Sequence, residues 1–404
     1  MRVIQVNKFN YLRGGAEKYF LELSSQLETA GYEVAKFCMV DQRNLEDPWS
    51  KYWPSNINLE TPSLGDRLRA PGRVIYSKRA KHNLMAMIKV FKPDLIHVHN
   101  IYHQLSPSIL DAARLANVPV IMTLHDYKII CPNYLLLNHG VICEKCLDGN
   151  FWHCFRERCF KDSWSQSLLA SLEAIYHQHH KTYERGVKLF IAPSHFMADK
   201  CEQAGWPKDK LRIIINPVSL LSTVKRQPQN YFLYVGRLSK EKGVDILLKA
   251  IAQTNYPLKI AGSGPEENHW RTLAQELGLE NQVEFLGQKT PKEVSQLLAG
   301  AIAVVIPSIW YENMPFSLLE ALAHGCPVVA SNIGGLPEII KIGYNGWLCQ
   351  PGEVKSLVQA LNLAQEADPI LMGQQARESV RGYSWDYHLK AIEAIYQEIV
   401  GSKV

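Results

Sequence analysis

Two glutamates with seven residues between them, Glu312 and Glu320, carry the strongest chemical signal in the sequence. An apolar strand pattern ends near Pro307, and we expect a helix to open near Pro315, because proline is favoured in a first helical turn. The first N–H groups of a helix have no partners inside it and can bind phosphate or sugar oxygens. The expected ligand contacts in this segment are Asn313, Met314, Pro315, Phe316, Ser317 and Glu320.

Each glutamate has an expected role that follows from its position. Glu320 lies about one and a half turns into the helix, where its carboxylate can accept hydrogen bonds from a cis-diol such as ribose. Glu312 lies in the loop before the helix and can do the same for a sugar. The alternative is that both are solvated side chains beside an ordinary strand–helix unit.

Two cations, Arg237 and Lys242, flank a short loop between a strand and a helix. Such a pair can neutralise a diphosphate leaving group, much as a metal ion would. Two exposed basic residues on a loop are the alternative. A glycine turn with Gly262 and Gly264 follows the expected strand Leu258–Ala261, but glycine turns after strands are common and this one is only supporting.

Two glycines and a histidine are candidate ligand-binding residues in the amino-terminal half. Gly14 and Gly15 precede a helix, and their size permits close backbone approach to a ligand, with a purely structural turn as the alternative. His125 ends an apolar strand, so we expect it at the carboxyl edge of a sheet, where open α/β sheets bind ligands. Asp126 follows and is expected to orient its imidazole.

Two groups of residues, one of histidines and one of cysteines, have side chains that can bind metal ions. His97 and His99 share one face of a strand, and packing or contacts with an acceptor are favoured over metal ligation. Four cysteines could hold a structural zinc ion: Cys143, Cys146, Cys154 and Cys159. The first two have the two-residue spacing of common zinc ligands, but the last two do not, so reduced thiols are favoured. No Asp-x-Asp pair occurs, so we expect no metal site and assign charge neutralisation to basic residues.

Strands that alternate with helical patterns must position these residues. Such alternation predicts α/β domains with parallel sheets covered by helices. The strands expected in the first half are Val3–Val6, Val34–Met39, Asp94–His99, Val118–Leu124, Leu189–Pro193 and Arg212–Ile215. Those expected in the second half are Phe232–Gly236, Leu258–Ala261, Val283–Leu286, Ile302–Ile306 and Val328–Ala330. With 404 residues, the chain is long enough for two such domains.

A polar stretch at 216–230 with two prolines separates the halves and sets the domain prediction. The first domain is expected to span 1–216, with a cysteine-rich insertion at about 131–160. The second is expected to span 217–383. Residues 384–404 have the pattern of an amphipathic helix, whose apolar face must pack on another part of the chain.

The segment of Glu312 and Glu320 closely resembles the glutamate–seven-residue–glutamate signature of the retaining glycosyltransferase family 4, whose fold is called GT-B. Segments 231–251 and 262–265 resemble the family as well. The family's usual glycine after the first glutamate is Asn313 here, which is a departure from the pattern. The resemblance implies two facing Rossmann-like, doubly wound domains, with the C-terminal helix returning to the first domain.

The same resemblance implies a function and a set of site residues. The protein would move a hexose from a nucleotide sugar, UDP-glucose being the first choice, onto a polysaccharide, a glycolipid or a lipid-linked oligosaccharide, and would need no cofactor. The implied catalytic residues are His125, Glu312, Arg237 and Lys242, and the implied donor-binding residues are Gly14, Gly15, Gly262, Gly264 and the six named above between Asn313 and Glu320. A nucleotide-sugar epimerase of the same fold and a non-catalytic nucleotide-sugar-binding protein are the alternatives.

Composition and charge narrow the classes of protein to which the chain can belong. The chain is 47% hydrophobic and 21% charged, as globular proteins are, and a formal net charge of +5 gives no reason to expect nucleic acid as a partner. Met1–Val6 has the pattern of a strand and not of a signal peptide, so a cytoplasmic location is expected. A basic stretch at 64–92 predicts contact with an anionic membrane at its inner face, with a plain solvated helix as the alternative; its cations are Arg67, Arg69, Arg73, Lys78, Arg79, Lys81, Lys89 and Lys92.

Overall fold

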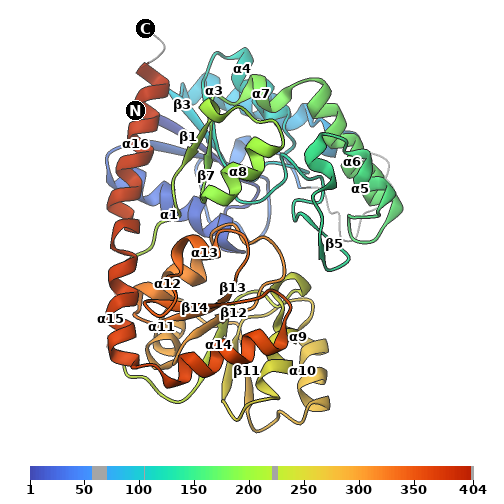
Figure 1. The fold of residues 1–404 in the computed structure, drawn as a ribbon. Helices are drawn as coiled ribbons and strands as arrows, with labels where there is room; N and C mark the ends of the chain where they lie inside the picture. Colours follow the sequence, from blue (N-terminus) through green and yellow to red (C-terminus); the bar gives the residue numbers. More distant parts are fainter. Residues whose placement is uncertain (57–70, 104, 221–225, 402–404) are drawn as a thin grey trace. The chain divides into compact units, whose positions relative to one another are not determined.

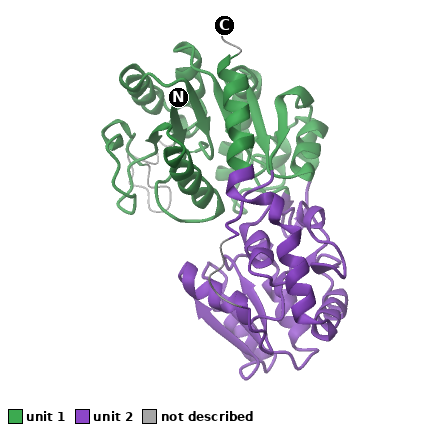
Figure 2. Cartoon of the chain, turned by 90° about the vertical axis from the view of Figure 1, so that its left-hand side faces the viewer, with its two compact units in different colours: residues 1–136, 144–214, 388–404 green, residues 137–143, 215–387 purple. Residues whose placement is uncertain are grey.

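The computed structural model describes residues 1–56, 71–103, 105–220 and 226–401. The chain divides into two compact units, coloured separately in Figure 2. Unit 1 consists of Met1–Leu136, Glu144–Ile214 and the C-terminal residues from His388 onward. Unit 2 consists of Leu137–Cys143 and Ile215–Tyr387. In the described ranges, no helix is both long enough and apolar enough to span a bilayer.

Unit 1 is built on a six-stranded parallel sheet (Figure 1). Its order is β2 (Glu33–Phe37), β1 (Arg2–Val6), β3 (Leu95–Val98), β4 (Val120–Thr123), β7 (Leu189–Ala192) and β8 (Leu211–Ile213). Every residue of β3, β4 and β7 is buried, as expected for strands with helices over both faces. The helices between the strands include α1 (Gly15–Thr29), α3 (Lys78–Phe91), α4 (Ser108–Leu115) and α8 (His195–Gln203). The predicted α/β architecture is confirmed for this half.

The C-terminal helix α16 (Trp385–Gly401) returns to unit 1, as predicted. Its buried residues His388, Ile392, Ile395 and Tyr396 recur at helical spacing and form one face. The hydroxyl of Tyr396 accepts a hydrogen bond from Nε2 of Gln5 on β1, at 3.1 Å. This contact joins the last helix of the chain to its first strand.

Unit 2 contains a second six-stranded parallel sheet. Its order is β11 (Val283–Gly287), β10 (Leu258–Ala261), β9 (Phe232–Val235), β12 (Val304–Ile306), β13 (Val328–Ser331) and β14 (Gly346–Cys349). Successive residues of β12 belong to different cores, because side chains alternate across a sheet. Val304 packs in the core that contains α12 (Phe316–Ala323), and Val305 packs in the core of α9 (Val244–Ile251) and α14 (Val354–Glu366). Both faces are therefore covered by helices.

The predicted cysteine-rich insertion contains a short antiparallel hairpin and two helices. The hairpin is formed by β5 (Leu137–Asn138) and β6 (Val141–Ile142), and it clusters with unit 2. The helices are the short 3-10 helix η2 (Lys145–Asp148) and α5 (Trp152–Arg156), which belong to unit 1; α6 (Trp164–His179) follows the insertion in the same unit. The insertion therefore contributes to both units.

Candidate functional site

The carboxylate of Glu312 lies in the loop after β12 and is almost fully buried. Its Oε1 accepts hydrogen bonds from Nζ of Lys242, at 2.7 Å, and from Oγ of Ser308, at 2.5 Å. The Lys242 ammonium also lies over the ring of Trp310, 5.0 Å from its centroid. The fold thus brings together two residues that were predicted from separate motifs. The lysine side chain stays 22% exposed, so its charge remains accessible to a ligand in solution.

Two glycines hold the loops of Glu312 and Lys242 in place. Gly243 has φ +67°, and a Cβ there would lie 2.1 Å from the carbonyl oxygen of Pro307. Gly334 has φ +62°, and a Cβ there would lie 2.2 Å from the carbonyl oxygen of Glu312. Because other residues rarely adopt such φ values and would also clash, both positions require glycine. The backbone around the ion pair is therefore fixed from two sides.

The predicted glycine turn packs against the loop of Arg237. A Cβ on Gly262 would lie 1.9 Å from the carbonyl oxygen of Gly236, and one on Gly264 would lie 2.2 Å from that of Leu238. The turn therefore approaches the loop as closely as two backbones can. Arg237 itself is exposed directly after β9. Its guanidinium is placed on a rigid loop and is free to meet an anion from solvent.

Helix α12 begins at Phe316, one residue after the predicted opening at Pro315, whose backbone is extended. The carbonyl of Met314 accepts a hydrogen bond from Nδ2 of Asn216, at 2.8 Å, which holds the chain entering the helix. Glu320 is half-buried on the second turn. The other predicted contacts are the buried Asn313 and Met314 and the half-buried Pro315, Phe316 and Ser317.

In unit 1, Gly14 and Gly15 are exposed at the start of α1. Gly14 has extended backbone that any residue adopts, with φ −168°. A Cβ there would meet nothing closer than the carboxylate of Glu17, at 3.6 Å. The packing of unit 1 therefore gives no steric reason for glycine at position 14.

His125 follows β4, at the carboxyl edge of the sheet, as predicted. Burial lowers the pKa of His125 to about 3, so its imidazole is neutral. Nε2 lies 3.0 Å from Nδ1 of His99 at the end of the neighbouring strand. The expectation that Asp126 orients His125 is wrong: its carboxylate accepts hydrogen bonds from the hydroxyl of Tyr102 and from the N–H of Lys128 instead. Burial raises the pKa of Asp126 to about 6.

His97 and His99 are completely buried, so neither faces an acceptor or a metal. His97 bonds to Tyr396 and Thr123, each at 2.8 Å. His99 bonds to Gln5 at 2.8 Å as well as to His125. The packing interpretation of the two histidines is correct, and the interpretation as acceptor contacts is wrong.

The cysteines of the insertion are free thiols in the structure. Cys146 and Cys154 pack with Phe151 and Ala170 in a small apolar core, with Cys159 at its margin. Across the described ranges, no three His, Cys, Asp or Glu side chains are grouped so that they could hold a metal ion.

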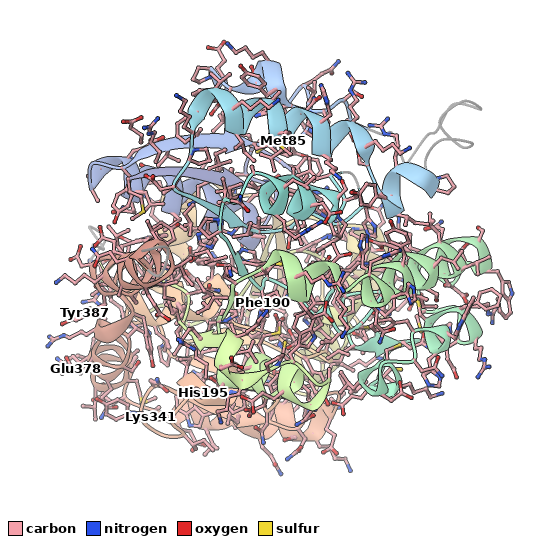
Figure 3. All side chains as sticks on the ribbon, turned by 90° about the horizontal axis from the view of Figure 1, so that it is seen from above. Met85, Phe190, His195, Lys341, Glu378 and Tyr387 are labelled. Atoms are coloured by element: carbon pink, nitrogen blue, oxygen red, sulfur yellow. The ribbon has the colours of Figure 1, made fainter. Side chains whose placement is uncertain are left out.

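Helix α3 carries most of the described cations of the predicted basic surface, with Arg73 before it and Lys92 just after it; Arg67 and Arg69 lie outside the described residues. Figure 3 labels Met85 on this helix. Ala80, Leu84, Met87, Ile88 and Phe91 form its buried face. The exposed cations are Lys78, Arg79, Lys89 and Lys92, while Arg73 and Lys81 are half-buried.

Four residues that support the site were missed from the sequence: Ser308, Asn216, Gly243 and Gly334. The two glycines lie in short loops after strands, where a signal exists but is common to many folds. Asn216 could not be found because its partner, Met314, is distant in the sequence. Ser308 lies only four residues before Glu312, but a serine in a loop is too common to indicate such a contact.

Two family models match the chain, one to each half. Residues 13–220 match the model described as Glycosyltransferase Family 4, and residues 222–379 match Glycosyl transferases group 1. Among curated relatives, the putative colanic acid biosynthesis glycosyltransferase WcaL of Escherichia coli is 28% identical over 52% of this chain. The D-inositol 3-phosphate glycosyltransferase of Corynebacterium aurimucosum is 32% identical over 42%. The matched stretches span 57% and 44% of these two relatives, about half of each.

Solved structures match over nearly the whole chain. Sucrose-phosphate synthase from Thermosynechococcus elongatus has a TM-score of 0.74 at 20% identity, covering 99% of both chains. HepE of Anabaena in complex with UDP-glucose has a TM-score of 0.68 at 20% identity, covering 100% of both. The lipopolysaccharide outer core galactosyltransferase WaaB has a TM-score of 0.67 at 20% identity, covering 98% of this chain and 100% of WaaB. At these identities the likeness concerns the fold.

Proposed function

We propose, from the premise that this chain belongs to glycosyltransferase family 4 and has the GT-B fold, that it transfers a hexose from a nucleoside diphosphate sugar to a glycan or lipid-linked acceptor. The observation that carries the proposal is the pairing of Lys242 with the buried Glu312, beside the exposed Arg237 and near the start of α12. The two cations and the carboxylate thus lie on loops of one unit, which supports a donor site there.

The donor site follows from the chemistry of these groups. Arg237 and Lys242 neutralise the diphosphate, and the positive end of the α12 dipole attracts its oxygens. Glu320, on the next turn, accepts hydrogen bonds from the ribose hydroxyls. Glu312 accepts a hydrogen bond from a hydroxyl of the sugar. The turn of Gly262 and Gly264 lets the nucleotide approach the backbone.

The proposed reaction retains the anomeric configuration and uses no protein nucleophile. The bond between the anomeric carbon and the diphosphate oxygen breaks, and the acceptor oxygen bonds to the same face of the sugar. The proton of the acceptor hydroxyl passes to the departing diphosphate oxygen. Arg237, Lys242 and the N-terminus of α12 stabilise the negative charge that develops there.

UDP-glucose is the proposed donor. HepE, solved with UDP-glucose, supports this choice by its likeness in fold. The acceptor is proposed to be a polysaccharide, a glycolipid or a lipid-linked oligosaccharide, in line with the names of WcaL and WaaB. We place the protein in the cytoplasm, where α3 would hold it at the inner face of the membrane.

Incubation with UDP-glucose and candidate acceptors, with UDP release and product stereochemistry followed by NMR, tests the proposal. We expect acceptor-dependent UDP release and an α-linked product from the α-linked donor, with activity retained in EDTA. Release of free sugar without an acceptor would favour the epimerase alternative. Tight donor binding without any turnover would favour the non-catalytic alternative, and either result would overturn the proposed transfer.

A further inference from the structure

A continuous row of hydrogen bonds leads from the C-terminal helix to His125 inside unit 1. The Nε2 of His125 lies 3.0 Å from Nδ1 of His99, and Nε2 of His99 lies 2.8 Å from Oε1 of Gln5. Nε2 of Gln5 in turn donates to the hydroxyl of Tyr396 on α16, at 3.1 Å. Gln5, His99 and Tyr396 are each 0% exposed, so water does not compete for these bonds.

The direction of each bond follows from the amide of Gln5. Its Oε1 can only accept, so Nε2 of His99 must carry the ring proton. Burial lowers the pKa of His99 well below its usual value, so its ring is neutral and its Nδ1 carries no proton. An unprotonated Nδ1 can only accept a hydrogen bond, so Nε2 of His125 must donate to it. His125 is neutral too, which leaves its own Nδ1 without a proton.

A second branch runs in the same direction. Because the hydroxyl of Tyr396 accepts from Gln5, its own proton is available to Nδ1 of His97, at 2.8 Å. Nε2 of His97 then donates to Oγ1 of Thr123, at 2.8 Å, and the threonine hydroxyl bonds to Tyr19. The Tyr19 hydroxyl lies 2.8 Å from Nε2 of His388. Each of these side chains can donate one hydrogen bond and accept one, so all the hydrogen bonds can run in the same direction along the row.

The second branch begins and ends on α16, at Tyr396 and His388. His388 directly follows Tyr387, which Figure 3 labels and which is the last residue of unit 2. The helix therefore holds both branches against β1, β3 and α1. The ring of Tyr19 also packs edge-on against that of His125, with centroids 5.2 Å apart, which limits rotation of the imidazole.

We propose that Gln5, His99 and Tyr396 are positioning residues that set the tautomer of His125, so that its Nδ1 offers a lone pair to a sugar hydroxyl. Nδ1 of His125 has no hydrogen-bond partner among the residues that the structure describes. His125 therefore accepts from the ligand and does not donate to it. This assignment rests on the proposed function only in that the ligand is a sugar.

Nitrogen NMR of the ligand-free protein, labelled in its histidines with ¹⁵N, tests the tautomer directly. We expect His125 to be neutral with its proton on Nε2. Gln5→Leu removes the acceptor for His99 and should give a mixture of tautomers at His125. Gln5→Glu keeps an oxygen that only accepts and should preserve the parent spectrum at His125. Tyr32→Phe is the matched control, because the ring of Tyr32 packs against Tyr396 with centroids 6.2 Å apart but lies outside the row.

A proton on Nδ1 of His125 in the parent protein would overturn the proposal, as would an unchanged tautomer in Gln5→Leu. These readouts need no donor, so they stand even if the protein transfers no sugar. If NMR shows the expected tautomer but the protein has no turnover, the proposed function fails and the tautomer assignment stands.

Turnover with monodeoxy and monodeoxyfluoro UDP-glucose then tests the consequence. At the hydroxyl that His125 contacts, both analogues should lose kcat/KM by about tenfold, because neither can donate a hydrogen bond. His125→Ala should abolish that discrimination. A fluoro analogue that keeps the parent rate where the deoxy analogue loses it would show that His125 donates, and would overturn the assignment. Gln5→Leu should lower kcat/KM about tenfold, and Gln5→Glu should restore it.

Discussion

The ion pair between Lys242 and Glu312 joins the chemistry of two separate motifs. In the free protein, the ammonium compensates a carboxylate that is almost fully buried. In the donor complex, the same ammonium would face the diphosphate. The two loops that carry the pair are held by glycines at which a side chain would clash with backbone.

We predict that Lys242→Met lowers transfer by about a hundredfold or more, because one charged donor to the leaving group is lost. Stability should also fall, by up to about 3 kcal/mol, because the substitution leaves the buried carboxylate of Glu312 without its cation. The control is Lys240→Met, an exposed lysine on the same loop, which should leave transfer and stability nearly unchanged. Steady-state kinetics and urea unfolding measure the two effects. Parent-like turnover in Lys242→Met would remove the lysine from the donor site.

Most residues of the candidate site could be predicted because they lie in local motifs, but the partner of His125 could not. Asp126 was chosen because it is adjacent in the sequence, whereas neighbours at the end of a strand point in different directions. The actual partner, His99, comes from the adjacent parallel strand. Such a pairing depends on strand order, which periodicity does not reveal.

At the scale of elements, every strand expected from the sequence is present, with ends shifted by one or two residues. Apolar runs in parallel sheets are buried on both faces and are therefore easy to find. The edge strand β14 was missed, because Gly346–Cys349 is short and starts with glycine. The hairpin of β5 and β6 was missed because each strand has only two residues.

Helix α3 is the element on which the membrane prediction depends. Its apolar face is buried and Ser77 caps its first turn, so the exposed cations are held on a stable helix. We expect the protein to sediment with anionic liposomes at low salt, each basic residue near the surface contributing about 1 kcal/mol before screening. Lys78→Glu with Lys89→Glu should weaken sedimentation severalfold.

The matched control is Lys292→Glu with Lys355→Glu, two exposed lysines of unit 2 that change the net charge equally. It should bind liposomes nearly as the parent does. Binding that is absent, or that ignores lipid charge and salt, would rule out attachment through α3.

At the scale of the whole molecule, two six-stranded parallel sheets and a returning C-terminal helix form the GT-B fold. Both family matches together extend from residue 13 to residue 379, so the family relationship involves both units. The fold class could be predicted because alternating strands and helices recur through both halves. The amphipathic pattern of 384–404 predicted only that α16 packs on another part of the chain. That it returns to the first domain was implied by the resemblance to family 4.

Calorimetric titration with UDP shows whether unit 2 binds a nucleoside diphosphate sugar with Glu320 on the ribose. We predict that the parent binds UDP and that Glu320→Ala weakens binding by about tenfold to a hundredfold, the loss of hydrogen bonds to a charged group. Glu276→Ala, an exposed glutamate at the end of α10 (Glu267–Glu276) in the same unit, should bind UDP as the parent does. A parent protein that does not bind UDP, or a Glu320→Ala variant that binds it equally tightly, would contradict the account.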